Sequence, residues 1–181
     1  MSMIICEETN GRIFQGDIFK NVPYVESFSE SNGQIEVAII TFPYAIVISQ
    51  ECDLQWDSNK RPDGFDLISA LLIPLYNYEH VLDGSYLEHL GTKMGTISKK
   101  TNKTDNKNLR QNETPRYHYL EFPDDVEIVP SVADFKQYFA VSIDTLSKLK
   151  DNDYVCTIAS PFKEHLVQRF TNYLSRIGLP V

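Results

Sequence analysis

The chain has 181 residues, with a hydrophobic fraction of 42%, a charged fraction of 23% and a formal net charge of −8. These values are ordinary for a globular protein and exclude collagen-like, coiled-coil and intrinsically disordered classes. The acidic balance also argues against a whole surface that attracts nucleic acid or anionic membranes. The length suits one domain, so we expect residues 1–181 to form a single domain.

The cysteines and the apolar runs indicate a reduced compartment. Cys6, Cys52 and Cys156 lie far apart and form no CxxC pair, which argues against a disulfide framework and against a cysteine-based zinc site. No stretch approaches the roughly eighteen apolar residues of a membrane helix. The scattered glycines form no phosphate-binding motif. We therefore expect a cytoplasmic protein without a membrane partner, a metal or a cofactor.

The first half of the chain is predicted to be β. Asn32 and Gly33 form the strongest short hairpin signal, and the β-branched run at residues 34–41 follows it. Pro43 is expected to interrupt this strand. Residues 44–49 are an apolar run of strand length, which is typical of a buried central strand.

A loop and a second apolar run are expected next. Residues 56–66 are rich in Asn, Asp, Pro and Gly, which predicts a loop. Residues 67–75 are apolar, and Pro74 favours a strand end over a helix. Residues 76–90 then have helix-like apolar spacing.

The segment at residues 96–116 is strongly polar. Six basic residues against two acidic ones give it a charge of +4, and the basic residues are Lys99, Lys100, Lys103, Lys107, Arg110 and Arg116. Two interpretations stay open: a solvated, mobile insertion loop, or a basic flap over a phosphate-bearing partner. In both, residues 76–116 are a partly helical insertion outside the core.

The last third returns to β and ends in a helix. Strands are predicted at residues 117–122, 138–142 and 154–158, with a short helical turn at residues 143–150. Ser160 is a good N-cap with Pro161 at the first helical position. The apolar stripe of the final helix consists of Phe162, Leu166, Phe170, Leu174 and Ile177. This helix is expected to dock on the sheet.

The order of these elements resembles the MazF/PemK family, which are SH3-like barrels that cleave RNA as toxins of toxin–antitoxin pairs. Gly16, Asp17, Ile18 and Phe19 are similar to the opening strand of that family. Residues 44–49 resemble its second strand, and residues 72–75 its third strand with the internal proline. Residues 140–149 and 154–166 resemble its final strand, turn, strand and Ser-Pro-capped helix.

The resemblance implies a mainly β fold, an SH3-like curved barrel with a C-terminal helix, and RNA or an antitoxin-like protein as partner. Two catalytic positions of the family differ in this chain. No basic residue stands before the second strand, at residues 41–44, and Tyr76 takes the place of the threonine after Pro74. The resemblance therefore supports the fold more than the metal-independent RNase activity.

Residues 49–53 follow the buried strand and form a first candidate site. Side chains at such a strand end commonly face a cleft, which makes Ser49 and Gln50 candidate pocket residues. Asp53 either caps a turn or acts in catalysis, and Cys52 is either a small packed side chain or a nucleophile. A catalytic thiol needs a nearby base, for which His118 is the best-placed histidine.

Residues 116–119 form a second candidate site. His118 could serve as the base or the acid of RNA cleavage, and Arg116 or Arg110 as the cation that holds the phosphate. Tyr117 and Tyr119 could stack on bases. Strand alternation is expected to place Arg116 and His118 on one face and the tyrosines on the other, and an ordinary strand with its aromatic residues inward is the simpler interpretation.

Three functions therefore stay open. The first is a nucleic-acid-binding protein related to RNA-cleaving toxins, either active or degenerate, that uses the basic segment and Tyr76. The second is a non-enzymatic protein–protein interaction module. The third is a thiol- or histidine-dependent enzyme centred on Cys52 or His118. The net charge favours the second function, and the basic segment favours the first.

Overall fold

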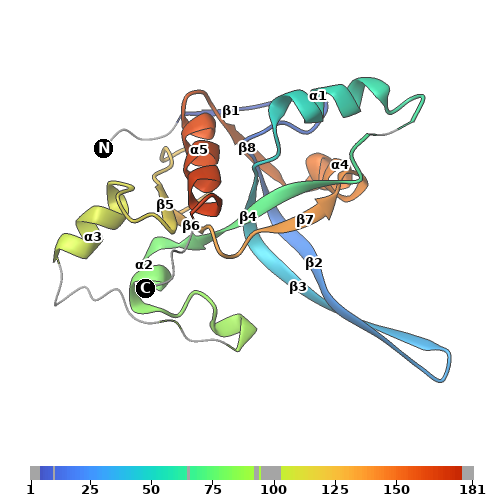
Figure 1. Ribbon diagram of the computed structural model, residues 1–181, viewed down its shortest axis with the longest axis horizontal. Helices are drawn as coiled ribbons and strands as arrows, with labels where there is room; N and C mark the ends of the chain where they lie inside the picture. Colours follow the sequence, from blue (N-terminus) through green and yellow to red (C-terminus); the bar gives the residue numbers. More distant parts are fainter. Residues whose placement is uncertain (1–4, 10, 65, 92–93, 95–102, 177–181) are drawn as a thin grey trace. The chain divides into compact units, whose positions relative to one another are not determined.

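The computed structural model describes residues 5–9, 11–64, 66–91, 94 and 103–176 (Figure 1). The fold is mainly β, with a curled antiparallel sheet and a C-terminal helix, which confirms the predicted fold class and is consistent with an SH3-like barrel. The chain divides into two compact units. The hairpin unit comprises Glu8–Pro74 and Tyr138–Thr157, and the terminal unit comprises Met1–Glu7, Leu75–Gln137 and Ile158–Val181.

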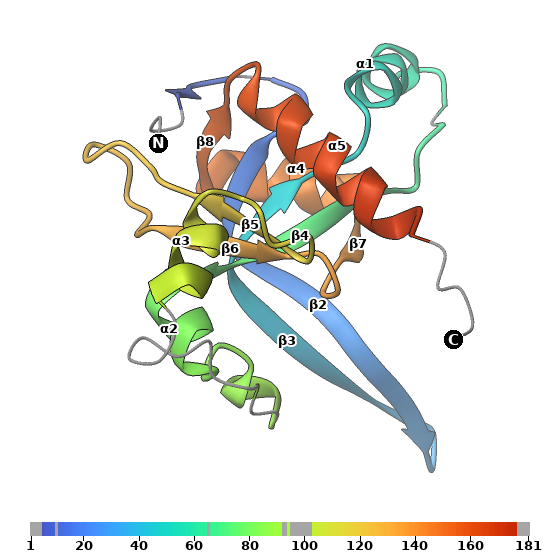
Figure 2. The ribbon, with the colours of Figure 1, turned by 60° about the vertical axis from the view of Figure 1, so that its left-hand side comes forward.

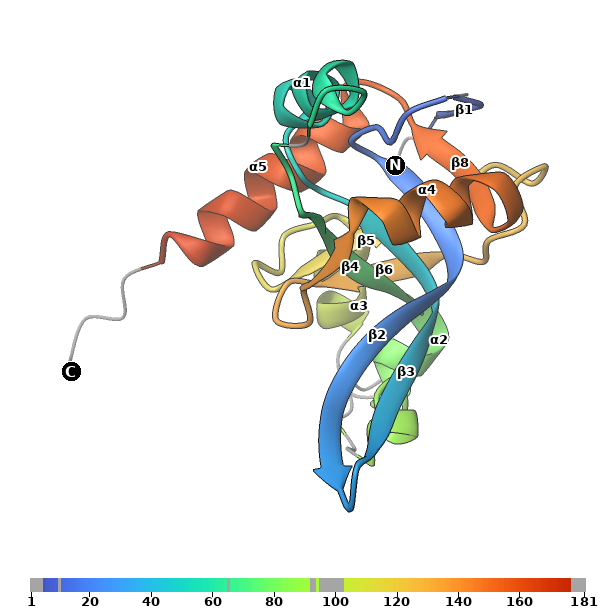
Figure 3. The ribbon, with the colours of Figure 1, turned by 90° about the vertical axis from the view of Figure 1, so that its right-hand side faces the viewer.

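The hairpin unit is an antiparallel sheet with two helices. Strand β2 pairs with β3 and β8, and β4 pairs with β3 and β7 (Figure 3). The strands are β2 (Asp17–Ser31), β3 (Gln34–Val47), β4 (Ser69–Asn77), β7 (Phe139–Ser142) and β8 (Tyr154–Ile158), and the helices are α1 (Glu51–Lys60) and α4 (Ile143–Asn152). The ends of β4 and β8 belong to the terminal unit.

The core of the hairpin unit lies where β3 pairs with β2 on one side and with β4 on the other. Phe19, Val22, Ala45, Val47 and Leu72 are fully buried in it. Residues 16–19, 44–49 and 67–75 were predicted to contribute strands to one curved antiparallel sheet, and β2, β3 and β4 confirm this prediction. Apolar runs of strand length therefore located the buried centre of this unit correctly.

Two local predictions in this unit are wrong. Pro43 does not interrupt β3, which runs from Gln34 to Val47, and the facing position in β2 is Asn21, whose φ is 54°. Residues 56–60 belong to helix α1 and not to a loop. Acidic residues in the first turn of α1 and Lys60 in its last turn suit the helix dipole, and the helix ends just before Pro62.

The terminal unit combines a small sheet with helices. Strand β6 pairs with β5 and with residues 75–77 of β4, and the Ala159 N–H donates to the Ile5 carbonyl beside β1 (Figure 2). The strands are β1 (Cys6–Glu7), β5 (Tyr117–Leu120) and β6 (Ser131–Asp134), and the helices are α2 (Tyr78–Asp83), the 3₁₀ helix η1 (Glu88–Leu90), α3 (Lys103–Arg110) and α5 (Phe162–Leu174).

From residue 103 onward, the basic segment packs in this unit. The prediction of a mobile loop at residues 96–116 is therefore wrong for residues 103–116. Residues 103–110 form α3, and Leu109 is 1% exposed in an apolar cluster with Val81, Leu82 and Tyr119. The side chain of Asn112 accepts a hydrogen bond from the Tyr119 N–H at 2.6 Å. Residues 96–102 lie outside the described residues.

Helix α5 confirms the predicted terminal helix and its apolar stripe at the centre. Leu166 and Phe170 are buried, whereas Leu174 is exposed near the end of the helix and Ile177 lies outside the described residues. The helix begins at Phe162, so Pro161 occupies the N-cap position and not the first helical position. The Ser160 hydroxyl instead donates to the Glu164 carboxylate at 2.6 Å.

Candidate functional site

Strands β2 and β3 extend beyond the rest of their unit as a two-stranded arm, which we define as residues 25–39 (Figures 1 and 3). Strand β8 pairs with β2 only at residues 17–19, and β4 pairs with β3 only at residues 45–47. Within the described part of the chain, the two strands of the arm therefore pair only with each other.

The tip of the arm is the hairpin that the sequence predicts. Asn32 and Gly33 connect the strands, with φ values of 52° and 77°. Positive φ at both central residues is the property of a type I′ turn, whose twist matches that of a two-stranded ribbon. The turn residues therefore fix the register of the arm at its tip.

The large apolar side chains of the arm share one face. Val25 lies opposite Ile39, and Phe28 lies opposite Val37. Directly opposed residues in an antiparallel pair point to the same face, and Ile35, Val37 and Ile39 alternate along one strand. All five are exposed: Val25 54%, Phe28 80%, Ile35 71%, Val37 51% and Ile39 59%.

A β-bulge produces this alignment. Val25 and Phe28 are three residues apart, so in a regular strand they would point to opposite faces. The register shifts between Val25 and Ser27, which leaves Glu26 as the extra residue and returns Phe28 to the face of Val25. The opposite face of the arm carries Ser27, Ser29, Ser31, Glu36 and Ala38. The arm is thus amphipathic, and its apolar face is open to solvent.

The first predicted site, residues 49–53, opens helix α1 in the hairpin unit. The Ser49 hydroxyl accepts a hydrogen bond from the Leu71 N–H at 2.8 Å, so it ties the strand end to β4. Gln50 is the exposed N-cap residue, and Cys52 and Asp53 are exposed in the first turn. The Cys52 thiol faces the side-chain oxygens of Gln50 and Asp53, at 3.6 and 3.5 Å.

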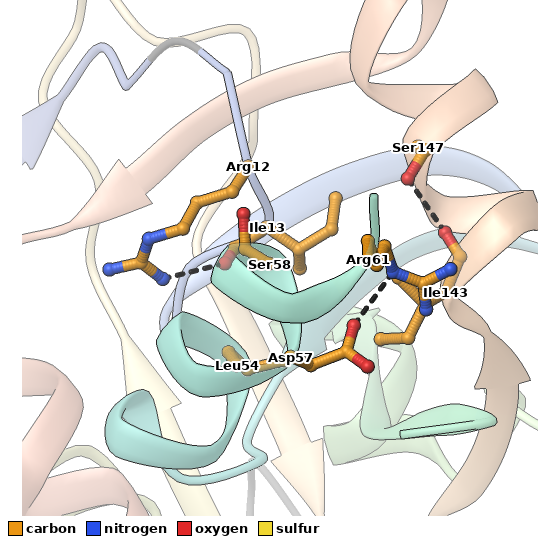
Figure 4. A pocket seen from close by; sticks show the side chains of 8 residues that line it. All are labelled: Arg12, Ile13, Leu54, Asp57, Ser58, Arg61, Ile143 and Ser147. Atoms are coloured by element: carbon orange, nitrogen blue, oxygen red, sulfur yellow. Dashed lines mark hydrogen bonds and ion pairs between the residues drawn. The ribbon is translucent and has the colours of Figure 1, made fainter. Parts of the chain in front are cut away.

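A cavity of about 60 Å³ lies beside α1, lined by side chains of α1 and α4 together with Arg12, Ile13 and Arg61 (Figure 4). Its two arginines already have carboxylate partners: Arg12 pairs with Glu51, and Arg61 with Asp57 at 2.7 Å. Burial would raise the pKa of Asp57, but the N–H groups of Leu67 and Asp66 and the Arg61 guanidinium hold that pKa below its usual value. Because its arginines are paired with carboxylates and its volume is small, we interpret this cavity as a packing contact and not as a ligand site.

The second predicted site lies in the terminal unit, where His118 is 3% exposed. Burial, with the nearby Arg169 and His165, lowers the pKa of His118 to about 3. Its ring lies 5.3 Å from that of His165, and its Nδ1 has no hydrogen-bond partner within the described residues. His118 is therefore a neutral, buried side chain at neutral pH, which makes it a weak proton acceptor.

Arg116 does not lie beside His118 as strand alternation predicted. Its guanidinium forms a two-bond contact with the Asp134 carboxylate, at 2.6 and 2.8 Å, and donates to the Tyr86 hydroxyl at 3.2 Å. The hydrogen-bonded Asp134 raises the pKa of Arg116. Arg116 precedes β5 and turns toward the side of Tyr117, where it lies 4.9 Å from the ring centre. It therefore stabilises a buried carboxylate.

The other predicted phosphate-binding residues are not gathered around a pocket. Lys107 is exposed on α3, Arg110 lies 3.6 Å from the Glu121 carboxylate, and Tyr76 is buried. Burial, followed by the Asp134 charge, raises the pKa of Tyr76. Lys103 lies in α3 with its side chain undescribed, and Lys99 and Lys100 lie outside the described residues.

The hairpin of the arm was predicted, but the exposure of its apolar face was not. The alternation of Ile35, Val37 and Ile39 with polar residues is typical of a strand with one buried face. Nothing in this pattern distinguishes an apolar face covered by the same chain from one open to solvent. An acidic, serine-rich segment on the partner strand, residues 26–31, was the available clue.

No helix in the described residues has both the length and the apolar character needed to cross a membrane. Across those same residues, no three His, Cys, Asp or Glu side chains are placed to hold a metal ion together. The chain matches no known protein family, no curated protein and no solved structure.

Proposed function

We propose that this protein is a protein–protein interaction module that binds its partner through the apolar face of the β2–β3 arm. The observation that carries the proposal is the alignment of five large, exposed apolar side chains on one face of a ribbon. Contiguous exposed apolar patches of this kind mark interaction surfaces. The net charge of −8 agrees with a protein partner better than with nucleic acid.

The energetics of the arm support the same proposal. An isolated two-stranded hairpin is at best marginally stable in water, and the apolar face of the arm makes no core of its own. Covering the exposed part of each of its five side chains contributes about 1 kcal/mol, hence about 5 kcal/mol for the face. A partner that covers the face therefore stabilises the arm as well as the complex.

Substitution of the apolar face tests the proposal directly. Phe28→Ser, Ile35→Thr and Val37→Thr together remove most of the exposed apolar area while keeping residues that suit a strand. The matched control, Ser27→Thr, Ser29→Thr and Ala38→Thr, changes the opposite face of the same segment. Tagged wild type and both variants are expressed in the source cells, and co-purified proteins are quantified by mass spectrometry.

A specific partner is expected to be retained by the wild type and by the control, and lost with the apolar-face variant. The interaction is then measured with purified partner, where the apolar-face variant should lose at least 100-fold in affinity, because about 3 kcal/mol of burial is removed. Equal retention of every co-purified protein by all three chains would contradict the proposal.

Nucleic-acid binding by a relative of the MazF/PemK toxins is the second candidate. What supports it is a cavity of about 140 Å³ in the terminal unit, lined by Arg169 and Arg176 together with Glu113. Burial lowers the pKa of Arg169, and its guanidinium donates to the carbonyls of Thr114 and Tyr117, with no carboxylate partner within the described residues. An arginine of this kind suits an anionic group such as phosphate.

Fluorescence anisotropy with single-stranded RNA tests this second candidate. The affinity should fall as salt rises, and Lys99→Ala, Lys100→Ala and Lys103→Ala together should reduce the salt slope. Specific cleavage is not expected, because Tyr76 replaces the threonine of the resembling family and no arginine precedes its second strand. Absence of RNA binding at low salt would contradict this second candidate and leave the protein–protein interaction module as the proposed function. For the thiol- or histidine-dependent enzyme, neither Cys52 nor His118 provides a supporting observation.

A further inference from the structure

We propose that the occupant of the arm is a basic amphipathic helix of another protein, which lies along the apolar face with lysine or arginine beside Glu30 at the border of that face. This inference rests on the proposed function and identifies the kind of partner. Three properties of the arm support it: which of its surfaces is apolar, its length, and its charge.

The position of the apolar side chains favours a helix over an added strand. A strand that joins the arm would pair with the backbone of its edge and would leave the side-chain face open. A helix that packs on the face buries side chains of both strands at once, such as Phe28 and Val37. The apolar side chains of the arm point away from the ribbon plane, so the occupant must cover the face.

The length of the face fits a short helix. Ile35 and Ile39 are four residues apart on one strand, which is about 13 Å at the usual rise of a strand. Two helical turns span about 11 Å, so apolar side chains at positions i, i+3 or i+4, and i+7 of a helix match the row. The paired strands provide the width, with Val25 opposite Ile39 and Phe28 opposite Val37.

The negative charge of the arm favours a partner with a positive charge. Residues 25–39 contain Glu26, Glu30 and Glu36 and no basic residue, which gives the arm a charge of −3. All three glutamates are exposed, and none forms an ion pair within the described part of the chain. Glu30 lies opposite Ile35 near the tip, at the border of the apolar face. A partner with lysine or arginine beside its apolar stripe places opposite charges there.

The same charges argue against a second copy of this chain. Two arms packed face to face would bring together two segments that each carry a charge of −3, in a chain whose net charge is already −8. Like charges brought together at an interface oppose association. The arm also offers no helix that could cover the face of another arm, because residues 25–39 consist of two strands and their turn.

Designed peptides test the proposal with the full chain. Three fluorescent 18-residue peptides are titrated at low salt: an amphipathic helix of Leu and Lys, its counterpart of Leu and Glu, and a scrambled Leu/Lys peptide without an apolar stripe. Each is measured by anisotropy against four chains: the wild type, the Phe28→Ser/Val37→Thr variant, a Glu26→Gln/Glu30→Gln/Glu36→Gln variant, and a charge-matched control.

The charge-matched control is Asp63→Asn/Asp124→Asn/Asp125→Asn, which removes three exposed carboxylates outside the arm. It separates the charges of the arm from the overall acidity of the chain. The Leu/Lys helix is expected to bind the wild type and this control equally. It should bind the glutamate variant about tenfold more weakly at low salt, because loss of the −3 charge of the arm weakens its attraction for the lysines of the peptide. It should bind the apolar-face variant at least tenfold more weakly, and the other two peptides should bind weakly throughout.

The outcomes separate this inference from the proposed function. Equal binding of the Leu/Lys and Leu/Glu helices, or equal effects of the two charge variants, would overturn the basic partner. If the apolar-face variant still loses binding in that case, the arm remains an interaction surface. Equal binding of the scrambled peptide would overturn the helix. If every peptide bound the wild type and the Phe28→Ser/Val37→Thr variant equally well, the apolar face would not be the binding surface, and the proposed function would be contradicted.

Discussion

The two ends of the β2–β3 ribbon have similar residue types and opposite environments. At the base, Phe19 and Val22 of β2 and Ala45 of β3 are fully buried, because β8, β4 and the rest of the hairpin unit surround them. On the arm, Phe28 of the same strand is 80% exposed. The apolar side chains of the base hold the unit together, whereas those of the arm are available to another molecule. Position along one strand thus separates side chains that form the core from side chains that we propose bind a partner.

Charged residues show the same contrast between base and arm. At the base, Asp17 is fully buried and accepts hydrogen bonds from the Lys150 ammonium at 2.8 Å and the Phe14 N–H at 2.9 Å. The hydroxyl groups of Thr9 and Thr157 also donate to it. On the arm, Glu36 is exposed without such partners in the described residues. The buried carboxylate connects β2 with α4 and β8, whereas the exposed one makes no such connection within the described residues.

Asp17→Asn should have the largest effect on stability, a loss of about 3–5 kcal/mol, because it leaves the Lys150 ammonium buried without its counter-charge. Glu36→Gln is the matched change on the arm and should alter the free energy of unfolding by less than about 0.5 kcal/mol. Urea denaturation followed by circular dichroism measures both. Similar losses for the two variants would show that the ion pair at the base contributes little.

The apolar pair Phe19 and Phe28 provides the second test. Phe19→Ala should cost about 3–5 kcal/mol, since it removes a ring from the packed core. Phe28→Ala should change the free energy of unfolding by less than about 0.5 kcal/mol, because its ring makes few contacts that folding creates. Thermal unfolding of both variants checks the difference. A large loss for Phe28→Ala would mean that the arm is covered within the chain itself.

The sequence predicted those elements whose residues carry a local signal and missed those that lack one. The runs at residues 44–49 and 67–75, the Asn32 and Gly33 turn and the centre of α5 were predicted correctly, because local composition and periodicity determine them. Helix α1 was missed because it has a weak apolar pattern, with only Leu54 and Asp57 buried. Strand β6 was missed because its four residues, Ser131–Asp134, carry no strand signal long enough to recognise.

The candidate sites were harder to predict than the fold, because burial and pairing depend on contacts far along the chain. His118 and Arg116 were chosen for their chemistry, yet the fold buries the first and pairs the second with Asp134. The alignment of the arm depends on a bulge at Glu26, which no periodicity of the sequence reveals. Residue types therefore identify side chains that could react, whereas strand pairing and packing decide which side chains are exposed.

His118 gives a pH test that contrasts the buried terminal unit with the exposed arm. Its pKa is about 3 when folded and about 6.5 when unfolded, so the unfolded state binds the proton more tightly. Stability from the neutral side chain is therefore complete above pH 6.5 and is lost as the pH falls toward 3. The loss reaches about 1.4 kcal/mol per pH unit in that interval.

The measurement compares the free energy of unfolding between pH 6.5 and 5 for the wild type, His118→Gln and His80→Gln. His118→Gln removes the titrating group and should flatten the profile, whereas the exposed His80 is the control and should leave it unchanged. Arg169 and His165 also face His118 and remain in every variant, so the difference between the wild type and His118→Gln reports the titration of His118 in their presence. A wild-type profile as flat as that of His118→Gln would contradict the buried, neutral histidine.

The smallest effect is expected at the tip of the arm, where Gly33→Ala distinguishes local from global stability. Gly33 has a φ of 77°, which costs a residue with a Cβ atom about 1 kcal/mol, and no atom of the described chain lies within 4 Å of an added Cβ. The arm should therefore fray from its tip, while the free energy of unfolding stays within about 0.5 kcal/mol of the wild type. Hydrogen exchange should quicken at residues 25–39 and remain slow at residues 17–22 and 42–47. Faster exchange at the base would mean that arm and base unfold as one unit, and the division between folding and binding regions would then be wrong.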